Sequence, residues 1–149
     1  FRRAFANFEI DVVARFGPAD VERLLQDAGI VRHRGKIEAV IANAARALEL
    51  QAEAGSLAAF VWSFEPRPEA RPKRLDRATL GCLGQTSESR ALSKALKQRG
   101  WRFVGPTTVY AFMQAMGLVN DHLDGCVVRE AVEAERAAFT RPRAAADSD

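Results

Sequence analysis

The chain of 149 residues has few cysteines and prolines and no long apolar run. Its two cysteines, Cys82 and Cys126, lie far apart, which excludes a disulfide-dense secreted module and favours a reducing compartment. No apolar stretch approaches the roughly 18 residues that a membrane-spanning helix needs. With 10 glycines and 6 prolines, the chain is neither collagen-like nor of low complexity. The sequence therefore predicts a folded, soluble protein of the cytoplasm.

The charge balance is mildly basic. Lys and Arg number 22 against 19 Asp and Glu, which leaves a formal charge of +3 at pH 7. This excess is compatible with binding to nucleic acid but does not establish it. The sequence begins at Phe1 rather than methionine, and Phe1, Phe5, Phe8 and Val12 recur at the spacing of one helical face. We therefore expect a helix at this end and further structure upstream of it.

Helical periodicity dominates the chain and predicts an all-α fold. Helices are expected to begin at Pro18, near Lys36, at Ser56, at Ser87 and at Pro106, and the last of these should face inward with Val109, Phe112, Met113 and Met116. Residues 65–86 include the segment EPRPEARPKR, whose prolines predict a surface loop within one domain. Residues 128–139 are expected to form a helix, and residues 141–149 to fray.

The segment LKQRGWRFVGPT predicts a hairpin between two helices. Gly100 and Gly105 allow sharp turns and close approach of another molecule. The helix that starts at Pro106 presents free N–H groups near Thr107, which suit a phosphate. The residues predicted to contact DNA are Lys97, Arg99, Gly100, Trp101, Arg102, Phe103, Gly105 and Thr107. From spacing alone, a plain helical hairpin whose Trp101 and Phe103 fill the core is an equal alternative.

Two further motifs carry candidate chemistry. His122 and Cys126, four residues apart, can ligate one zinc ion, although a structural zinc needs about four ligands and a satisfied histidine beside an inert thiol is the simpler interpretation. Asp121 is a weak candidate for acid–base catalysis.

The segment RHRGK at residues 32–36 has four potential cations in five positions. We favour a solvated connector that pairs with acidic neighbours over a phosphate contact.

Three segments together resemble the 3-methyladenine DNA glycosylase I family. They read VERLLQDAGIVRHRGKIEAVIANA, FVWSFEP and SKALKQRGWRFVGPTTVYAFMQAMGLVNDHLDGC, and they occur in the family's order from about Phe1 to Cys126. The combination of RGWRFVGPT with a downstream NDHxxxC is highly specific. The resemblance implies an all-α helix-hairpin-helix glycosylase fold that is incomplete at the N-terminus. Residues 1–127 would form the glycosylase domain, and residues 128–149 a variable, partly disordered tail.

The resemblance also implies a function. The family flips a methylated adenine out of double-stranded DNA and hydrolyses its N-glycosidic bond, a step in base-excision repair. His122 and Cys126 match two of its four zinc ligands, and the other two ligands and the base pocket lie in a family segment that this sequence does not show. We therefore expect a monomer that acts on alkylated DNA, with this chain alone inactive. The alternative is a non-catalytic helical DNA-binding module.

Overall fold

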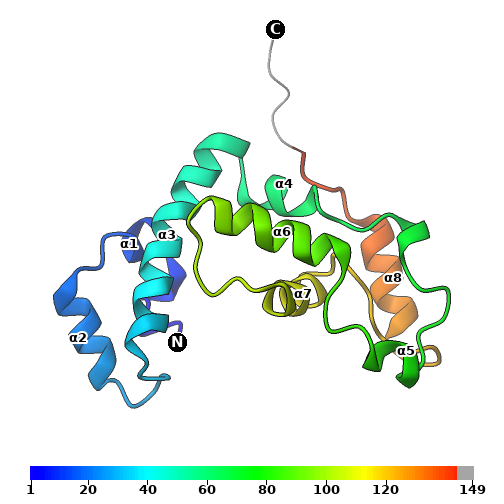
Figure 1. The fold of residues 1–149 in the computed structure, drawn as a ribbon, viewed down its shortest axis with the longest axis horizontal. Helices are drawn as coiled ribbons and strands as arrows, with labels where there is room; N and C mark the ends of the chain where they lie inside the picture. Colours follow the sequence, from blue (N-terminus) through cyan, green and yellow to red (C-terminus); the bar gives the residue numbers. More distant parts are fainter. Residues whose placement is uncertain (144–149) are drawn as a thin grey trace, which may run out of the picture.

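The structure, a computed structural model that describes residues 1–143, contains helices and connecting segments and no strand within those residues (Figure 1). The predicted all-α class is confirmed. The elements are the 3-10 helices η1 (Ala6–Phe8) and η2 (Pro68–Ala70), and the α-helices α1 (Ile10–Val13), α2 (Pro18–Gln26), α3 (Arg34–Ala54), α4 (Leu57–Trp62), α5 (Arg77–Gly81), α6 (Ser87–Gln98), α7 (Pro106–Ala115) and α8 (Arg129–Ala138).

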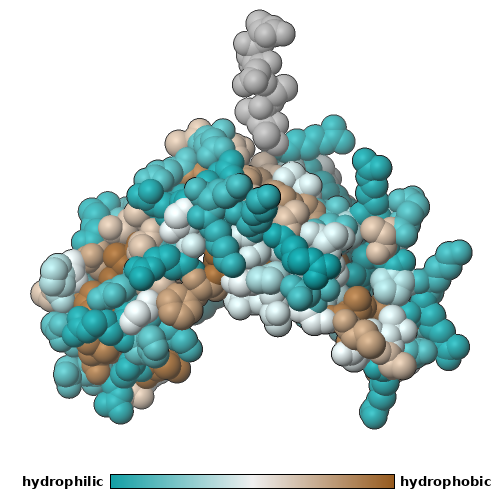
Figure 2. Space-filling view, in the orientation of Figure 1, coloured by the Kyte–Doolittle hydropathy of each residue, from teal (hydrophilic) through white to brown (hydrophobic). Residues whose placement is uncertain are grey.

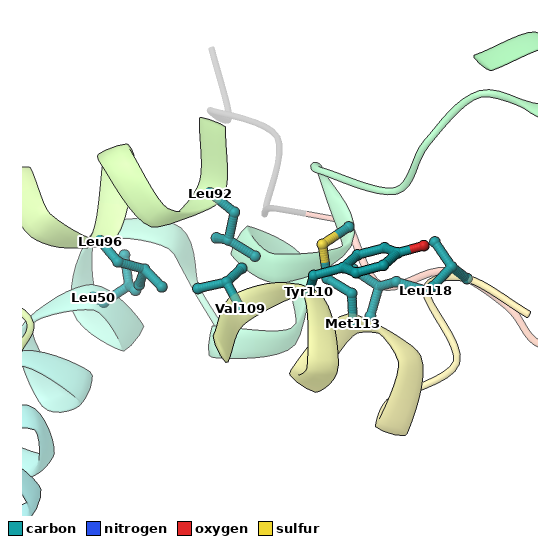
Figure 3. Packing of buried hydrophobic residues seen from close by; sticks show 8 residues of the cluster. Leu50, Leu92, Leu96, Val109, Tyr110, Met113 and Leu118 are labelled. Atoms are coloured by element: carbon teal, nitrogen blue, oxygen red, sulfur yellow. The ribbon is translucent and has the colours of Figure 1, made fainter. Parts of the chain in front are cut away.

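Two buried clusters share the long helix α3. The first cluster consists of Ala4, Phe5, Val13, Val21, Leu24, Ile30 and Ile37. The second consists of Leu50, Leu92, Leu96, Val109, Tyr110, Met113, Leu118 and Val119, whose side chains point toward one another between the helices (Figure 3). With 21 residues at about 1.5 Å each, α3 is long enough to serve both, Ile37 in the first and Leu50 in the second. Its middle turns therefore lie where the two halves of the molecule meet.

Side-chain caps explain where several helices begin. Ser56 accepts a hydrogen bond from the Ala59 amide, as the sequence predicts, and Thr86 caps α6 through the Ser89 amide. At the start of α3, the imidazole Nδ1 of His33 accepts from the Lys36 amide at 3.2 Å. Gly55, with φ of 74°, ends α3 in the left-handed region that favours glycine.

The predicted N-terminal helix is wrong for residues 1–8, and only α1 (Ile10–Val13) forms in this segment. Ala6, Asn7 and Phe8 adopt φ values of 47°, 55° and 63°, and three left-handed residues in succession cannot continue a right-handed helix. The resulting turn gathers aromatic rings around Phe5, which is 1% exposed, with the Phe1 ring centroid 6.3 Å away. Phe1 and Phe8 themselves stay largely exposed. The spacing of the phenylalanines thus reports an aromatic cluster rather than one helical face.

The predicted surface loop at residues 65–86 is partly confirmed. Most of it is irregular, but it contains η2 and the short helix α5, which Asp76 caps by accepting from the Thr79 amide at 2.9 Å. Leu75 is buried, and its amide donates to the Asp124 carboxylate at 2.9 Å. This segment therefore packs onto the body of the molecule as well as covering its surface.

The inward face of α7 differs from the predicted one. Val109 and Met113 are buried as expected, but Phe112 and Met116 are 42% and 56% exposed. Tyr110 takes the inward position instead, because its ring packs in the second cluster while its hydroxyl reaches a polar partner. The helix therefore leaves two large apolar side chains in solvent.

The predicted helix near the C-terminus is confirmed as α8. Arg136 of this helix and Arg141 beyond it both pair with Glu65, with Nη2–Oε1 distances of 3.0 and 2.9 Å. Hydrogen bonding to Glu65 raises the pKa of the Arg141 guanidinium. The fraying predicted for residues 141–149 is wrong at Arg141, which also donates to the Phe139 carbonyl at 2.9 Å, and residues 144–149 lie outside the described residues. Within the described chain, no helix combines the length and the hydropathy needed to cross a bilayer.

Candidate functional site

The hairpin between α6 and α7 (residues 99–105) begins with a helix end that requires glycine. Gly100 has φ of 79°, its amide donates to the Lys97 carbonyl at 3.0 Å, and the Trp101 amide donates to the Leu96 carbonyl at 3.1 Å. This pair of bonds is the Schellman motif, in which a left-handed residue ends a helix. The Trp101 side chain packs against the second cluster, as the hydrophobic contact of that motif requires.

The tip of the hairpin points away from the core. Phe103 adopts φ of 58° and is 56% exposed, and Arg102 is exposed beside it. Of the two aromatic residues that a plain hairpin would bury, Trp101 packs and Phe103 does not. The alternative in which both fill the core is therefore wrong.

Several backbone N–H groups on the hairpin are free to bind another molecule. Those of Phe103, Val104 and Gly105, and of Thr107 and Thr108 in the first turn of α7, form no hydrogen bond within the described residues. The Val104 carbonyl is satisfied by the hydroxyl of buried Ser93, which donates at 2.6 Å. These donors, unpaired among the described residues, lie at the positive end of a ten-residue helix, which suits an anionic group.

The cations near the hairpin fall into two groups. Lys97 and Arg102 are exposed and form no ion pair with a described residue, and neither do Arg90 and Lys94 on the same face of α6, where Figure 2 shows hydrophilic side chains gathered. Arg99 instead donates through Nε to Glu53 at 3.1 Å and stacks over the Phe60 ring at 4.9 Å. The hydrogen bond from Arg99 lowers the pKa of the Glu53 carboxyl.

His122 and Cys126 lie in the turn before α8. The His122 Nδ1 lies 2.7 Å from Asn120 Oδ1, which fixes the ring and leaves Nε2 without a partner among the described residues. The Cys126 amide donates to the Leu123 carbonyl at 2.9 Å, and its thiol is half-buried. Across the described chain, no three His, Cys, Asp or Glu side chains are grouped to hold a metal. The two side chains are of types that zinc accepts, and a structural zinc needs about four such ligands.

Asp121 lies at the centre of a polar network. Its Oδ2 accepts from the Tyr110 hydroxyl at 2.6 Å and from Gln114 Nε2 at 2.7 Å, and Oδ1 pairs with Arg71. Burial, followed by the bond to Asp121, raises the pKa of Tyr110 above its ordinary value. Because three donors occupy this carboxylate, the geometry favours an anchor that ties residues 65–86 to α7.

Comparison with known proteins identifies the family. The methyladenine glycosylase family model matches residues 1–130. DNA-3-methyladenine glycosylase 1 of Escherichia coli strain K12 is 50% identical over 127 residues, which are 85% of this chain and 66% of that protein. The Haemophilus influenzae DNA-3-methyladenine glycosylase is 41% identical over 85% of this chain and 67% of its own. The chain belongs to the methyladenine glycosylase family.

A solved family member has the same arrangement of helices. The 3-methyladenine DNA glycosylase I from Staphylococcus aureus, from a study of 3-methyladenine recognition, is 34% identical with a TM-score of 0.77, covering 86% of this chain and 67% of that one. The present family member thus spans about two thirds of the length of these relatives.

Sequence reasoning missed the residues that hold the hairpin of this glycosylase-family chain. The Asn43 side chain, in the middle of α3, donates to the Arg102 carbonyl and accepts from the Arg102 amide, both at 2.9 Å. Together with Ser93, it fixes the backbone of the tip. Asparagine has poor helix propensity, so its presence in the middle of a long helix is the one feature of the sequence that points to a tertiary contact for Asn43.

Proposed function

We propose that the protein containing this chain is a DNA glycosylase that removes 3-methyladenine from alkylated duplex DNA by hydrolysing the N-glycosidic bond. The family membership of residues 1–130 supports the proposal, as do the names of the two relatives. A solved structure of a point variant of 3-methyladenine DNA glycosylase I, 34% identical to this chain, is in complex with 3-methyladenine. The chain matches 66% of the length of the Escherichia coli relative, so we assign the activity to a protein of the relatives' full length.

The chemistry of the lesion explains why such an enzyme needs little activation. Methylation at N3 places positive charge on the adenine, which already weakens its bond to the sugar. The pocket then has to stack on the flipped base, favour its cationic form and exclude ordinary adenine. A strong nucleophile is not required, which agrees with an Asp121 that is engaged by three donors.

Within this scheme the present chain holds the DNA backbone. The observation that carries the proposal is the set of N–H groups on either side of Pro106, from Phe103 to Thr108, that have no partner in the described part of the chain and have Lys97 and Arg102 nearby in sequence. Backbone donors and cations of this kind bind phosphates without reading sequence, as a repair enzyme that searches all DNA requires. We propose that α6, the hairpin and α7 act as the helix-hairpin-helix unit of a monomeric cytoplasmic enzyme.

The test is release of the free base. Duplex DNA treated with a methylating agent is incubated with the 149-residue chain and with a protein of the relatives' full length, and free 3-methyladenine is quantified. We expect release by the longer protein and background release by this chain. A longer protein that binds the duplex and releases no base would favour a non-catalytic DNA-binding module, and release by the 149-residue chain would place the base pocket within it.

We also propose that His122 and Cys126 are two of four ligands of a structural zinc in the longer protein. Zinc bound there would tie the turn before α8 to the segment that carries the remaining ligands. Elemental analysis should find near-zero zinc in this chain and one ion per molecule in the longer protein, reduced by His122→Ala. Full zinc occupancy in that variant would contradict the assignment.

A further inference from the structure

The basic connector at residues 32–36 lies against the hairpin, although about 70 residues separate them in the chain. The ring of His33 meets that of Phe103 edge-on, with centroids 6.4 Å apart and planes at 81°. Between the two segments runs a groove of about 430 Å³. Its lining includes Lys36 and Asn43 of α3, Arg102 and Phe103 of the hairpin, and Thr108 of α7. We call it the connector groove.

The charged residues that line the connector groove, Lys36 and Arg102, are both cations. None of the described residues that line it carries a carboxylate. Lys36 and Arg102 on its walls, and Arg32 in the adjoining connector, are exposed and form no ion pair with a described residue. Arg34 behaves differently, because its guanidinium lies 2.7 Å from Glu22 and 3.9 Å from Glu38. The expected pairing with acidic neighbours therefore holds for Arg34 alone, and three cations remain available to a ligand.

The groove is continuous with the row of unpaired N–H groups. Thr108 lines the groove and also contributes one of the free amides of α7, and Arg102 belongs to both the groove and the hairpin tip. Asn43, which also lines the groove, holds the Arg102 backbone through two hydrogen bonds. An extended polyanion that binds the hairpin amides can therefore pass directly into the connector groove.

We propose that the connector groove is a second phosphodiester-binding site, in which Arg32, Lys36 and Arg102 hold the DNA backbone next to the stretch bound by the hairpin. The proposal rests on the DNA-binding part of the proposed function. It extends the DNA contact from one hairpin to a surface shared by α3 and α7. His33 supports the site by capping α3 and packing on Phe103, rather than by contributing charge.

The test compares the salt dependence of binding. Arg32→Gln/Lys36→Gln removes two cations from the groove, and Arg67→Gln/Lys73→Gln removes two exposed cations from residues 65–86, at the other end of the molecule (Figure 1). Affinity of each 149-residue protein for an undamaged duplex is measured between about 50 and 200 mM salt. For the groove variant, we expect the slope of log K against log salt to become shallower by about 2 relative to wild type. The control should keep the wild-type slope.

The outcomes separate the two proposals. A groove variant whose slope equals that of wild type and control overturns the connector groove and leaves the hairpin as the binding site. If wild type does not bind the duplex at all, DNA binding by this chain is wrong, and the groove proposal with it. Since both substituted side chains are exposed and form no ion pair within residues 1–143, the melting temperatures should agree. A slope change without a melting change then assigns the effect to DNA contact.

Discussion

Tyr110 combines a buried ring with a polar hydroxyl that needs a partner. It is 2% exposed, and its hydroxyl donates to Asp121, which also binds Gln114 and Arg71. Burial and the negative charge of Asp121 both disfavour the phenolate, so the pKa of Tyr110 in the folded protein lies above its usual value near 10. Because its pKa is raised, the Tyr110 hydroxyl stabilises the folded state while it stays protonated. Its contribution to the free energy of unfolding therefore depends on pH.

Tyr110→Phe should therefore lower stability at neutral pH and lose that effect in alkali. Below about pH 10, wild type should exceed the variant by about 1 kcal/mol in the free energy of unfolding, the usual value of a hydrogen bond. Above pH 10, the unfolded chain releases the phenolic proton before the folded chain does, so the difference should shrink as pH rises toward the folded pKa. Chemical denaturation of both proteins from pH 8 to 11 measures this difference in the free energy of unfolding. A difference that stays constant or grows with pH would contradict a raised pKa for Tyr110.

At the scale of helices and turns, the hairpin depends on contacts that local sequence does not report. Gly100 and the Pro106 start of α7 follow from residue type alone, because a left-handed helix end and a fixed first-turn φ are local requirements. The anchors Asn43 and Ser93 come from α3 and α6, and their role depends on tertiary placement. For the same reason, the sequence does not predict that Tyr110 lies on the buried face of α7. Helical periodicity cannot show that a polar partner for its hydroxyl lies in the core.

Asn43→Ala should loosen the hairpin tip. The variant loses two hydrogen bonds at a partly exposed site, which should cost about 1 to 2 kcal/mol in the free energy of unfolding. Because Arg102 then loses its fixed position, duplex affinity should fall while the fold persists. Thermal melting and duplex binding by fluorescence anisotropy check both effects, with Gln85→Ala as the control at an exposed position outside the helices, where the backbone is not left-handed. Unchanged affinity would mean that the placement of Arg102 does not matter for binding.

At the scale of the whole molecule, α3 joins two packed halves, and the hairpin lies against its middle. The all-α class and most helix starts could be predicted from periodicity and capping residues, which are local signals. The aromatic turn at Ala6–Phe8 and the packing of residues 65–86 could not, because both depend on contacts with distant segments. The proximity of residues 32–36 to Phe103 likewise appears only when α3 and α7 are placed together.

The central claim is that the hairpin amides bind DNA, and Gly105→Val tests it most directly. Gly105 has an ordinary φ of −63° and no described atom within 4 Å of where a Cβ would lie, so a Cβ clashes with nothing in the folded protein and would obstruct an incoming phosphate. Gly84→Val is the matched control, since a Cβ at Gly84 also meets no described atom within 4 Å and Gly84 precedes α6, whereas the hairpin follows it.

The measurement is the affinity of wild type and both variants for an undamaged duplex at several salt concentrations, with melting curves alongside. The account predicts that Gly105→Val binds at least about tenfold more weakly, a loss of about 1.4 kcal/mol, at every salt concentration and with an unchanged melting temperature, while Gly84→Val binds like wild type. Equal affinity of all three proteins would contradict it.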